Sequence, residues 1–324
     1  MPNLRTLFGF FYVVFFVVVF HCTACVSYHK ESGNLISVIQ DEDAKDFAEI
    51  AKIVKAIRPN VDEFRIPGPI PIVVKKQLVI PLSAGQSISY DMITPKKSSS
   101  HGPMVVLVHG NRSYKEAHRY QGEHLASFGF QVFIPQLPTS EVWSTNGLII
   151  KEFVQFMTRS TKQKVFLIGH SFGGSAITMA AYLGSKVSGL VYLDPAIFNQ
   201  SVASLLWNTK IPAILIGADS DIYRSKKRHL FREKYGGPFF ELSVRGATHN
   251  DAQYPSMFAL SHYGLDPAVS KKNQKLITCL MTASLFSLLV DRDHQFVDTL
   301  ARKLSNEGIV FDIFRRGSLG TLGK

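Results

Sequence analysis

From Met104 onward, short apolar runs alternate with segments of helical character, and this alternation is the strongest constraint on the fold. The runs are continuously apolar, which is typical of strands that are buried on both faces of a sheet. Helices are expected between the runs, and a long final helix is expected over Val269 to Leu289. The runs are MVVLVHG, FQVFIPQL, KVFLIG, SGLVYLDPA, IPAILIGAD and FFELSV. The pattern predicts one α/β domain, with a mostly parallel central sheet and helices on both faces.

The N-terminus has the features of an export signal. Arg5 precedes an uncharged apolar run from Leu7 to Phe20, and small or polar residues follow it. The run is shorter than the roughly 20 residues that a membrane-spanning helix needs. The stretch CTAC resembles the end of a bacterial lipoprotein signal, with Cys25 as the lipidated residue and residues 1–25 as the signal. We expect an exported protein tethered to the bacterial envelope membrane; an uncleaved anchor and a freely secreted form are the alternatives.

The remaining chain divides by composition into three parts. Residues 26–74 are expected to form a lead-in with one helix over Asp41 to Ile57, followed by several prolines. The main domain is expected over residues 75–305, starting with two strands around a turn near Ser83 to Gln86. Residues 306–324 are expected to form a C-terminal tail.

The chain is basic, with a formal net charge of +11 at pH 7. Its Lys and Arg residues lie in small scattered groups such as Lys226, Lys227 and Arg228, which are typical of solvated surface charge. Zinc-finger spacing, an RNA-recognition aromatic motif and a basic recognition helix are all missing from the sequence. We therefore expect no nucleic-acid partner.

The stretch GHSFGG lies between an apolar run and an alanine-rich helical segment. A strand, G-x-S-x-G and a helix in this order are typical of a nucleophile elbow, a strained turn that exposes a serine hydroxyl. Gly169 and Gly173 lack the Cβ atoms that would clash in so tight a turn. Ser171 is therefore the candidate nucleophile.

A serine hydroxyl is a weak nucleophile at neutral pH, so it needs a base and an orienting acid. His249 follows the run FFELSV in a glycine-containing loop and is the candidate base. Asp219 and Asp221 both follow the run IPAILIG, and their residue types do not separate them as the acid. Asp194 ends the preceding run, one strand earlier than the usual acid position, and is set aside.

Negative charge develops on the carbonyl oxygen during acyl transfer, so backbone N–H donors must already point at it. The amide of Phe172, which follows the nucleophile, is one candidate donor. The other is expected from the loop that follows His109 and Gly110, with Asn111 as the candidate. The chemistry requires no metal and no cofactor.

Together these residues resemble the α/β-hydrolase superfamily of serine esterases over roughly residues 75–305. The motifs LVHGNR, GHSFGG, GLVYLDPA, ILIGADSD and RGATHND are most similar to the branch of bacterial cutinases and polyester hydrolases, chlorophyllases and platelet-activating-factor acetylhydrolases. The resemblance implies a triad of Ser171, Asp221 and His249, because cutinases use the second aspartate of a matching GAD-x-D segment. The chain departs from cutinases at Asn111, where they carry an aromatic residue.

The substrate is constrained mainly by one short connection. Only fifteen residues separate Pro195 from Ile211, so no large cap domain is expected and the cleft should be open. Trp207, Phe198 and Tyr254 are expected at its rim. The sequence predicts a hydrolase of carboxylic esters; a membrane-tethered lipase or phospholipid acylhydrolase and a catalytically silent binding protein are the alternatives.

Overall fold

The computed structural model describes residues 64–96, 102–138, 143–197, 201–219, 227–256, 266–290 and 295–317. All of them belong to one compact unit of the chain. The expected signal at residues 1–25, the lipidation of Cys25 and the helix of the lead-in lie outside the described residues. Within the described part of the chain, no helix is long and apolar enough to cross a membrane.

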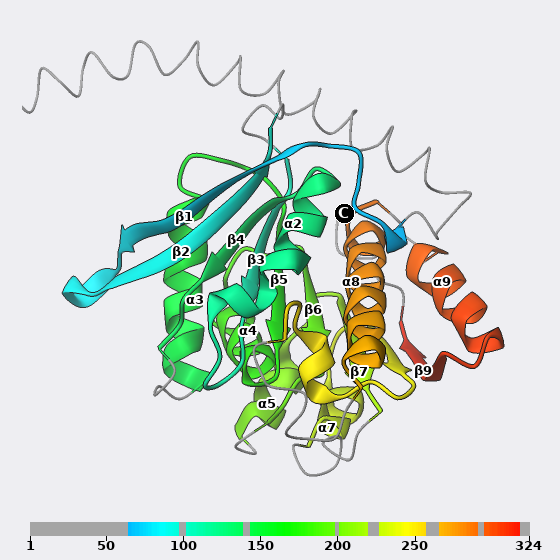
Figure 1. The fold of residues 1–324 in the computed structure, drawn as a ribbon. Coiled ribbons are helices and arrows are strands. Elements are labelled where there is room, and N and C mark those ends of the chain that lie inside the picture. The colour runs from blue at the N-terminus through cyan, green and yellow to red at the C-terminus, as the bar shows by residue number, and fades with distance from the viewer. Residues whose placement is uncertain are drawn as a thin grey trace, which may run out of the picture. The chain divides into compact units, whose positions relative to one another are not determined.

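The core of the domain is a nine-stranded sheet with the order β1-β2-β4-β3-β5-β6-β7-β8-β9 (Figure 1). Its strands are β1 (Ile72–Pro81), β2 (Ser87–Pro95), β3 (Met104–Val108), β4 (Gln131–Pro135), β5 (Val165–His170), β6 (Gly189–Leu193), β7 (Ala213–Ala218), β8 (Phe239–Val244) and β9 (Val310–Arg316). Strands β3 to β8 are parallel, whereas β1, β2 and β9 pair antiparallel with their neighbours. This confirms the predicted mostly parallel sheet.

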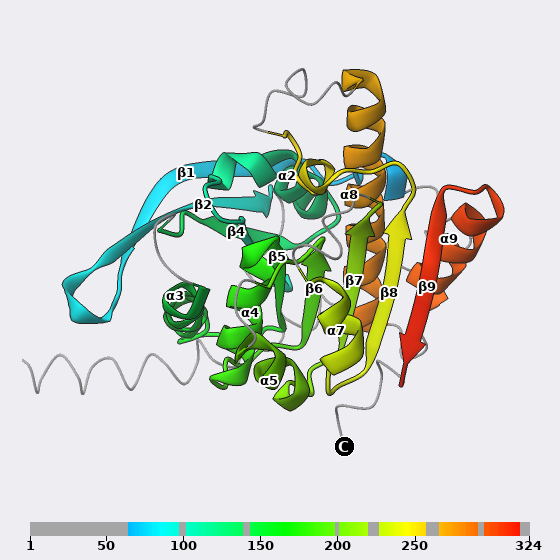
Figure 2. The ribbon, with the colours of Figure 1, turned by 90° about the horizontal axis from the view of Figure 1, so that it is seen from below.

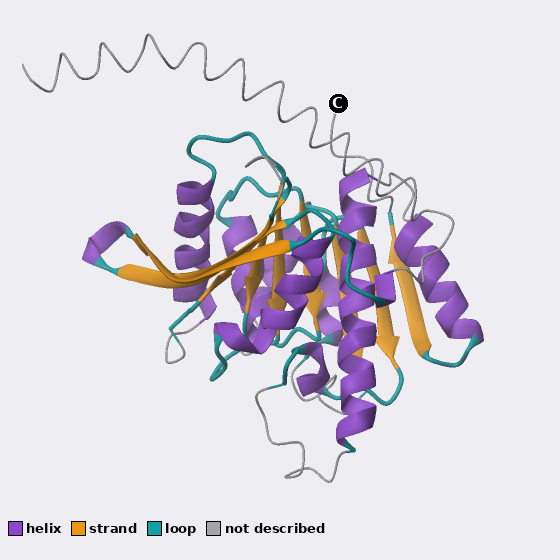
Figure 3. Ribbon diagram, turned by 45° about the horizontal axis from the view of Figure 1, so that its top comes forward, coloured by secondary structure: helices purple, strands orange, loops and turns teal. Residues whose placement is uncertain are grey.

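Helices cover both faces of the sheet, as Figures 2 and 3 show. Helices α2, α8 and α9 lie on one face, and α3, α4, α5 and α7 lie on the other. Their bounds are α2 (Arg119–Ser127), α3 (Trp143–Met157), α4 (Phe172–Tyr182), α5 (Ser201–Asn208), α7 (His229–Lys234), α8 (Pro267–Val290) and α9 (Gln295–Asn306). Short 3-10 turns are η2 (Ser83–Gly85), η3 (Lys115–His118) and η4 (His249–Ala252). Because the sheet is covered on both faces, every residue of β3 to β8 is buried, which explains the continuous apolar runs.

The ends of the domain differ from the expectation. Residues 306–324 do not begin as a tail, because Val310–Arg316 form β9 and pair antiparallel with β8. This segment has the sequence VFDIFRR, whose charged residues suit an edge strand with one side in solvent. At the other end, β1 begins at Ile72, inside the expected lead-in, while the turn near residues 83–86 is confirmed as η2 between β1 and β2.

Candidate active site

Ser171 lies at the sharp turn between β5 and α4, near the centre of the sheet. Its backbone φ is +55° and its ψ is −126°, a conformation that is strained for a residue with a Cβ. Two hydrogen bonds hold the turn: the carbonyl oxygen of Ser171 accepts from the amides of Gly174 and Ala196, both at 2.9 Å. The surrounding backbone therefore fixes the strained geometry that the elbow motif predicts.

The two glycines of the elbow are required by close backbone packing. A Cβ on Gly169 would lie 2.6 Å from the carbonyl carbon of Gly173. A Cβ on Gly173 would lie 2.6 Å from the carbonyl oxygen of His109, at the end of β3. Both obstacles are main-chain atoms, which cannot rotate away as a side chain could. The glycines thus let β3, β5 and α4 approach closely enough to present Ser171.

His249 begins η4, directly after the turn that follows β8, and its side chain reaches the serine. The Nε2 atom of His249 lies 2.9 Å from Oγ of Ser171. On the other side of the ring, Nδ1 lies 2.5 Å from Oδ2 of Asp194. All three side chains are buried. The turn that carries His249 is itself held by the carboxylate of Asp251, which accepts a hydrogen bond from the amide of Thr248 at 2.8 Å.

The carboxylate of Asp194 accepts hydrogen bonds through both of its oxygens. While Oδ2 contacts His249, Oδ1 accepts from the amide of Ala218 at 3.0 Å and from the guanidinium of Arg228. Burial alone would raise the pKa of Asp194, but the hydrogen bond and charge of His249 and the charge of Arg228 hold that pKa well below its usual range. Asp194 is therefore ionised at neutral pH and ready to stabilise a protonated imidazole.

We compared the sequence with models of known protein families. The model of the alpha/beta hydrolase family matches residues 105–314, which is more than half of the chain and includes Ser171, Asp194 and His249. The chain belongs to the alpha/beta hydrolase family. A search of curated proteins found no significant match.

The aspartate that contacts the imidazole of His249 is not one of the two that the sequence indicated. Asp194 occupies the place behind the imidazole that we expected Asp221 or Asp219 to take. Asp219 instead accepts a hydrogen bond from the amide of Gly246 at 2.8 Å, and Asp221 lies outside the described residues. The reason lies in strand register: β6 pairs with β5 so that Leu193 is opposite His170. Asp194, the residue that follows β6, therefore emerges beside Ser171.

The loop after β3 lies directly against the nucleophile of the hydrolase. A Cβ on Gly110 would lie 2.8 Å from the Cβ of Ser171. The amide of Leu137 donates to Nε2 of His109 at 3.0 Å, so Nδ1 carries the ring proton and donates to the carbonyl oxygen of Gly110 at 2.8 Å. In a trans peptide the N–H points opposite to the C=O, so the amide of Asn111 points away from the His109 ring.

His170 has a role that the sequence did not indicate. Its Nε2 lies 3.0 Å from the carbonyl oxygen of His249, and its Nδ1 lies 3.2 Å from Nε2 of Gln253. The NH₂ group of Gln253 can only donate, so Nδ1 of His170 accepts and Nε2 of His170 donates to the His249 carbonyl. Gln253 also donates to Oγ of Ser113 at 3.0 Å. His170 thus ties the loop of the base to the elbow.

Buried histidines should make the stability of this hydrolase depend on pH. Burial lowers the pKa of His118 to about 4 and, with the charge of His249, lowers the pKa of His170 well below its ordinary value. Between about pH 6.5 and pH 4 the unfolded chain binds the proton of His118 and the folded chain does not, so stability falls as pH falls. For His118 we expect the unfolding free energy to drop by about 2 kcal/mol between pH 7 and pH 5.

Urea unfolding at a series of pH values measures this loss. His118→Gln is the matched variant, because a glutamine amide can still donate to Oε1 of Gln121, which Nδ1 of His118 now contacts at 2.6 Å. The variant should lose about 2 kcal/mol less than the native protein over the same pH interval. An unfolding free energy that is equally pH-dependent in both proteins would contradict the assignment to His118.

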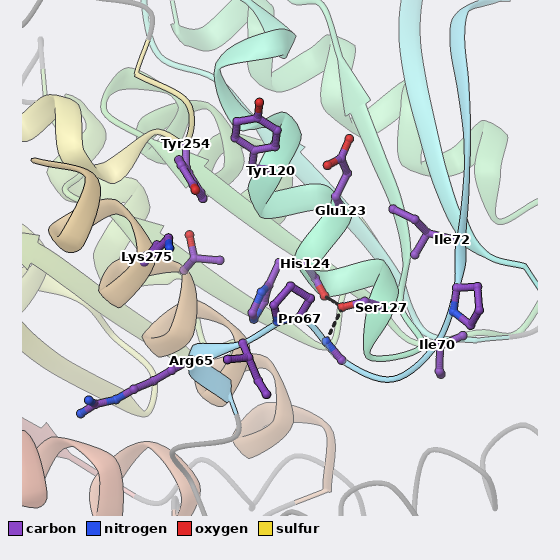
Figure 4. Close-up of a pocket in the computed structure, with 14 residues that line it drawn as sticks. Arg65, Pro67, Ile70, Ile72, Tyr120, Glu123, His124, Ser127, Tyr254 and Lys275 are labelled. Carbon is purple, nitrogen blue, oxygen red and sulfur yellow. Dashed lines mark hydrogen bonds between the residues drawn. The ribbon is translucent and has the colours of Figure 1, made fainter. Parts of the chain in front are cut away.

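The structure shows the surroundings of two of the residues that were expected at the rim of the cleft. Tyr254 packs against Tyr120, with ring centroids 4.9 Å apart, and lines a cavity of about 520 Å³ between α2, α8 and residues 65–72 (Figure 4). The residues of the triad do not line this cavity. The carbonyl oxygen of Trp207 accepts a hydrogen bond from Nζ of Lys210, shortly before β7 begins. Trp207 therefore lies near the N-terminal ends of the parallel strands, whereas Ser171 lies at their C-terminal ends. Phe198 lies outside the described residues.

Proposed function

We propose that this protein is a serine hydrolase that cleaves carboxylic esters through an acyl-enzyme intermediate. The hydrogen-bonded series from Asp194 through His249 to Ser171 is the observation that carries the proposal. In acylation, Oγ of Ser171 attacks the ester carbonyl while Nε2 of His249 takes the hydroxyl proton. The proton then passes to the departing alcohol oxygen, and Asp194 stabilises the imidazolium. Water, activated by the same imidazole, hydrolyses the acyl-enzyme and releases the acid.

The proposed oxyanion donors are the backbone amides of Asn111 and Phe172. Phe172 is the first residue of α4, where backbone N–H groups and the helix dipole favour negative charge. For Asn111, the support is the close approach of Gly110 to Ser171 and the hydrogen bond that directs the Gly110 carbonyl toward the ring of His109. Both donors would then be oriented before the substrate binds.

The substrate class is proposed from the motifs and the connection lengths. Similarity to cutinases, chlorophyllases and platelet-activating-factor acetylhydrolases favours an acyl ester of short to medium chain. The connection between β6 and β7 contains α5, a helix of eight residues, rather than a cap domain among its described residues. The basic net charge favours a second candidate, the acyl ester of an anionic or zwitterionic lipid at a membrane surface.

Covalent labelling tests the proposed nucleophile without knowledge of the natural substrate. We expect a fluorophosphonate probe to modify the native protein at Ser171, as mapped by peptide mass spectrometry, and to leave the urea-unfolded protein unmodified. A panel of p-nitrophenyl esters and phospholipid vesicles then separates soluble from lipid esters. A folded protein that neither reacts with the probe nor turns over any ester would support the binding-protein alternative and overturn the proposal.

A further inference from the structure

A buried arginine contacts the carboxylate of the triad on the side opposite the imidazole. Arg228 lies directly before α7, and its side chain is only 4% exposed. Its Nη1 donates to Oδ1 of Asp194 and to the carbonyl oxygen of Ala218, the latter at 2.8 Å, and its Nη2 donates to Oγ of Ser243 at 3.1 Å. Arg228 is therefore not the solvated surface charge that its neighbours Lys226 and Lys227 suggest in the sequence.

The sheet is shaped to accommodate this guanidinium. A Cβ on Gly217, in β7, would lie 2.5 Å from both Cζ and Nη1 of Arg228. The guanidinium thus lies across the strand at the one residue of β7 that has no side chain. Glycine inside a strand is costly unless another group approaches closely, so Gly217 and Arg228 act as a pair.

Further charges lie behind Arg228, away from the triad. Oε1 of Glu241, on β8, lies 3.9 Å from Nε of Arg228, and its other oxygen accepts from Nε of Arg232, on α7, at 2.7 Å. Arg232 also pairs with Asp312, on β9. Asp194 and Arg228 are therefore one end of a series of alternating charges that reaches the edge of the sheet.

A buried carboxylate stays ionised and correctly aimed only if its charge and its free oxygen are both compensated. The amide of Ala218 provides one donor to Oδ1, but an amide carries no net charge. Arg228 supplies both a second donor and a full positive charge. That charge also lies on the same side of the imidazole as Asp194 and therefore opposes protonation of the ring.

We propose that Arg228 is a positioning residue of the triad. It holds the Asp194 carboxylate in the orientation that contacts His249, and its positive charge partly compensates the negative charge of that carboxylate. This inference rests on the proposed serine hydrolase function. It predicts that Arg228 affects both the turnover number and the pH at which activity is lost on acidification. The groups that face Asp194 and Arg228 are His249 on η4, Glu241 on β8 and, beside the imidazole, His170 on β5.

Two substitutions of Arg228 separate the charge from the hydrogen bonds. With Arg228→Met, we expect kcat to fall about 10²-fold at nearly constant KM, because the carboxylate is no longer aimed. The midpoint of the acid limb of kcat/KM should rise by about 1 pH unit, because the positive charge that opposed imidazole protonation is gone. Arg228→Lys keeps the charge, so its acid limb should stay within about 0.3 pH unit of the native value, with kcat lowered less than in Arg228→Met.

Arg232→Met is the matched control, since it removes a guanidinium from the same series without touching Asp194. Its kcat should stay within about twofold of the native value, and the midpoint of its acid limb should stay within about 0.3 pH unit of the native midpoint. The folded fraction of each variant is measured by near-UV circular dichroism, and rates are normalised to it. A merely structural role would lower the activity of both Met variants in proportion to unfolding and leave both acid limbs in place, which would overturn the inference.

A spectroscopic readout keeps the test independent of turnover. The low-field proton resonance of the imidazole Nδ1–H reports its hydrogen bond to Asp194 in the resting protein. We expect this resonance to shift in Arg228→Met and to stay in place in Arg232→Met. Absence of labelling at Ser171 in the native protein would reject the proposed function, whereas native labelling with unchanged resonance and acid limb in Arg228→Met would reject only the role of Arg228.

Discussion

Replacing Ser171 by alanine is expected to lower kcat for ester hydrolysis about 10⁴- to 10⁶-fold, because the nucleophile is lost while the remaining site is kept. Among the described residues, the hydroxyl of Ser171 forms a hydrogen bond with His249 alone, at 2.9 Å. The unfolding free energy should therefore change by no more than about 1 kcal/mol. Initial rates with the best ester of the panel and urea unfolding of the same preparation measure the two effects.

Ser175→Ala is the matched control for the serine substitution. Ser175 is buried in α4, one turn after Ser171, and its Oγ donates to the carbonyl oxygen of Ala196 at 2.6 Å. This variant should lose about 1 kcal/mol of stability and keep kcat within about tenfold. Activity of Ser171→Ala within tenfold of the native rate would show that another group forms the acyl intermediate.

Replacing Asp194 by asparagine is expected to lower kcat about 10³- to 10⁴-fold. Both oxygens of Asp194 accept hydrogen bonds, whereas an asparagine has one oxygen and one NH₂ group. If the oxygen stays with Ala218 and Arg228, the NH₂ group faces Nδ1 of His249, which must then be unprotonated. The proton moves to Nε2, and the ring can no longer accept the proton of Ser171. The variant thus loses both the correct tautomer and the charge that stabilises the imidazolium.

The same substitution at the other two aspartates decides the identity of the acid. Asp219→Asn should keep kcat within a few-fold, because the carboxylate bonds only the amide of Gly246 among the described residues, and asparagine can accept that bond. Asp221→Asn should behave in the same way. A loss of about 10³-fold in Asp221→Asn, with activity retained in Asp194→Asn, would restore the acid expected from the cutinase resemblance.

The parts of the site that depend on a few neighbouring residues could be predicted from the sequence. The elbow is a local structure, since its strand, glycines and serine are contiguous, and the structure confirms the turn at Ser171. His249 follows the last parallel strand, and a loop at that edge of the sheet brings the ring to Ser171. The alternating apolar runs likewise predicted the parallel strands, because only a sheet covered on both faces buries such runs.

The acid could not be predicted because its position depends on which strands are neighbours. Asp194 and Asp219 both follow buried parallel strands, so residue type and position within the run are equal for the two. Only the pairing of β6 with β5 places Asp194 beside the nucleophile, while β7 lies one strand further away. The resemblance to cutinases pointed to the more distant strand.

What the sequence by itself determined is therefore the fold class, the strained turn at Ser171 and the histidine that meets it, because each depends on local pattern and on the burial of continuous apolar strands. The tertiary structure alone decided three features: the contact of Asp194 with His249, the buried charge of Arg228 and the edge strand β9. Each of these depends on a contact between segments far apart in the chain. The free energy of burying a charge, or of pairing an edge strand, depends on partner residues that a local sequence pattern does not identify.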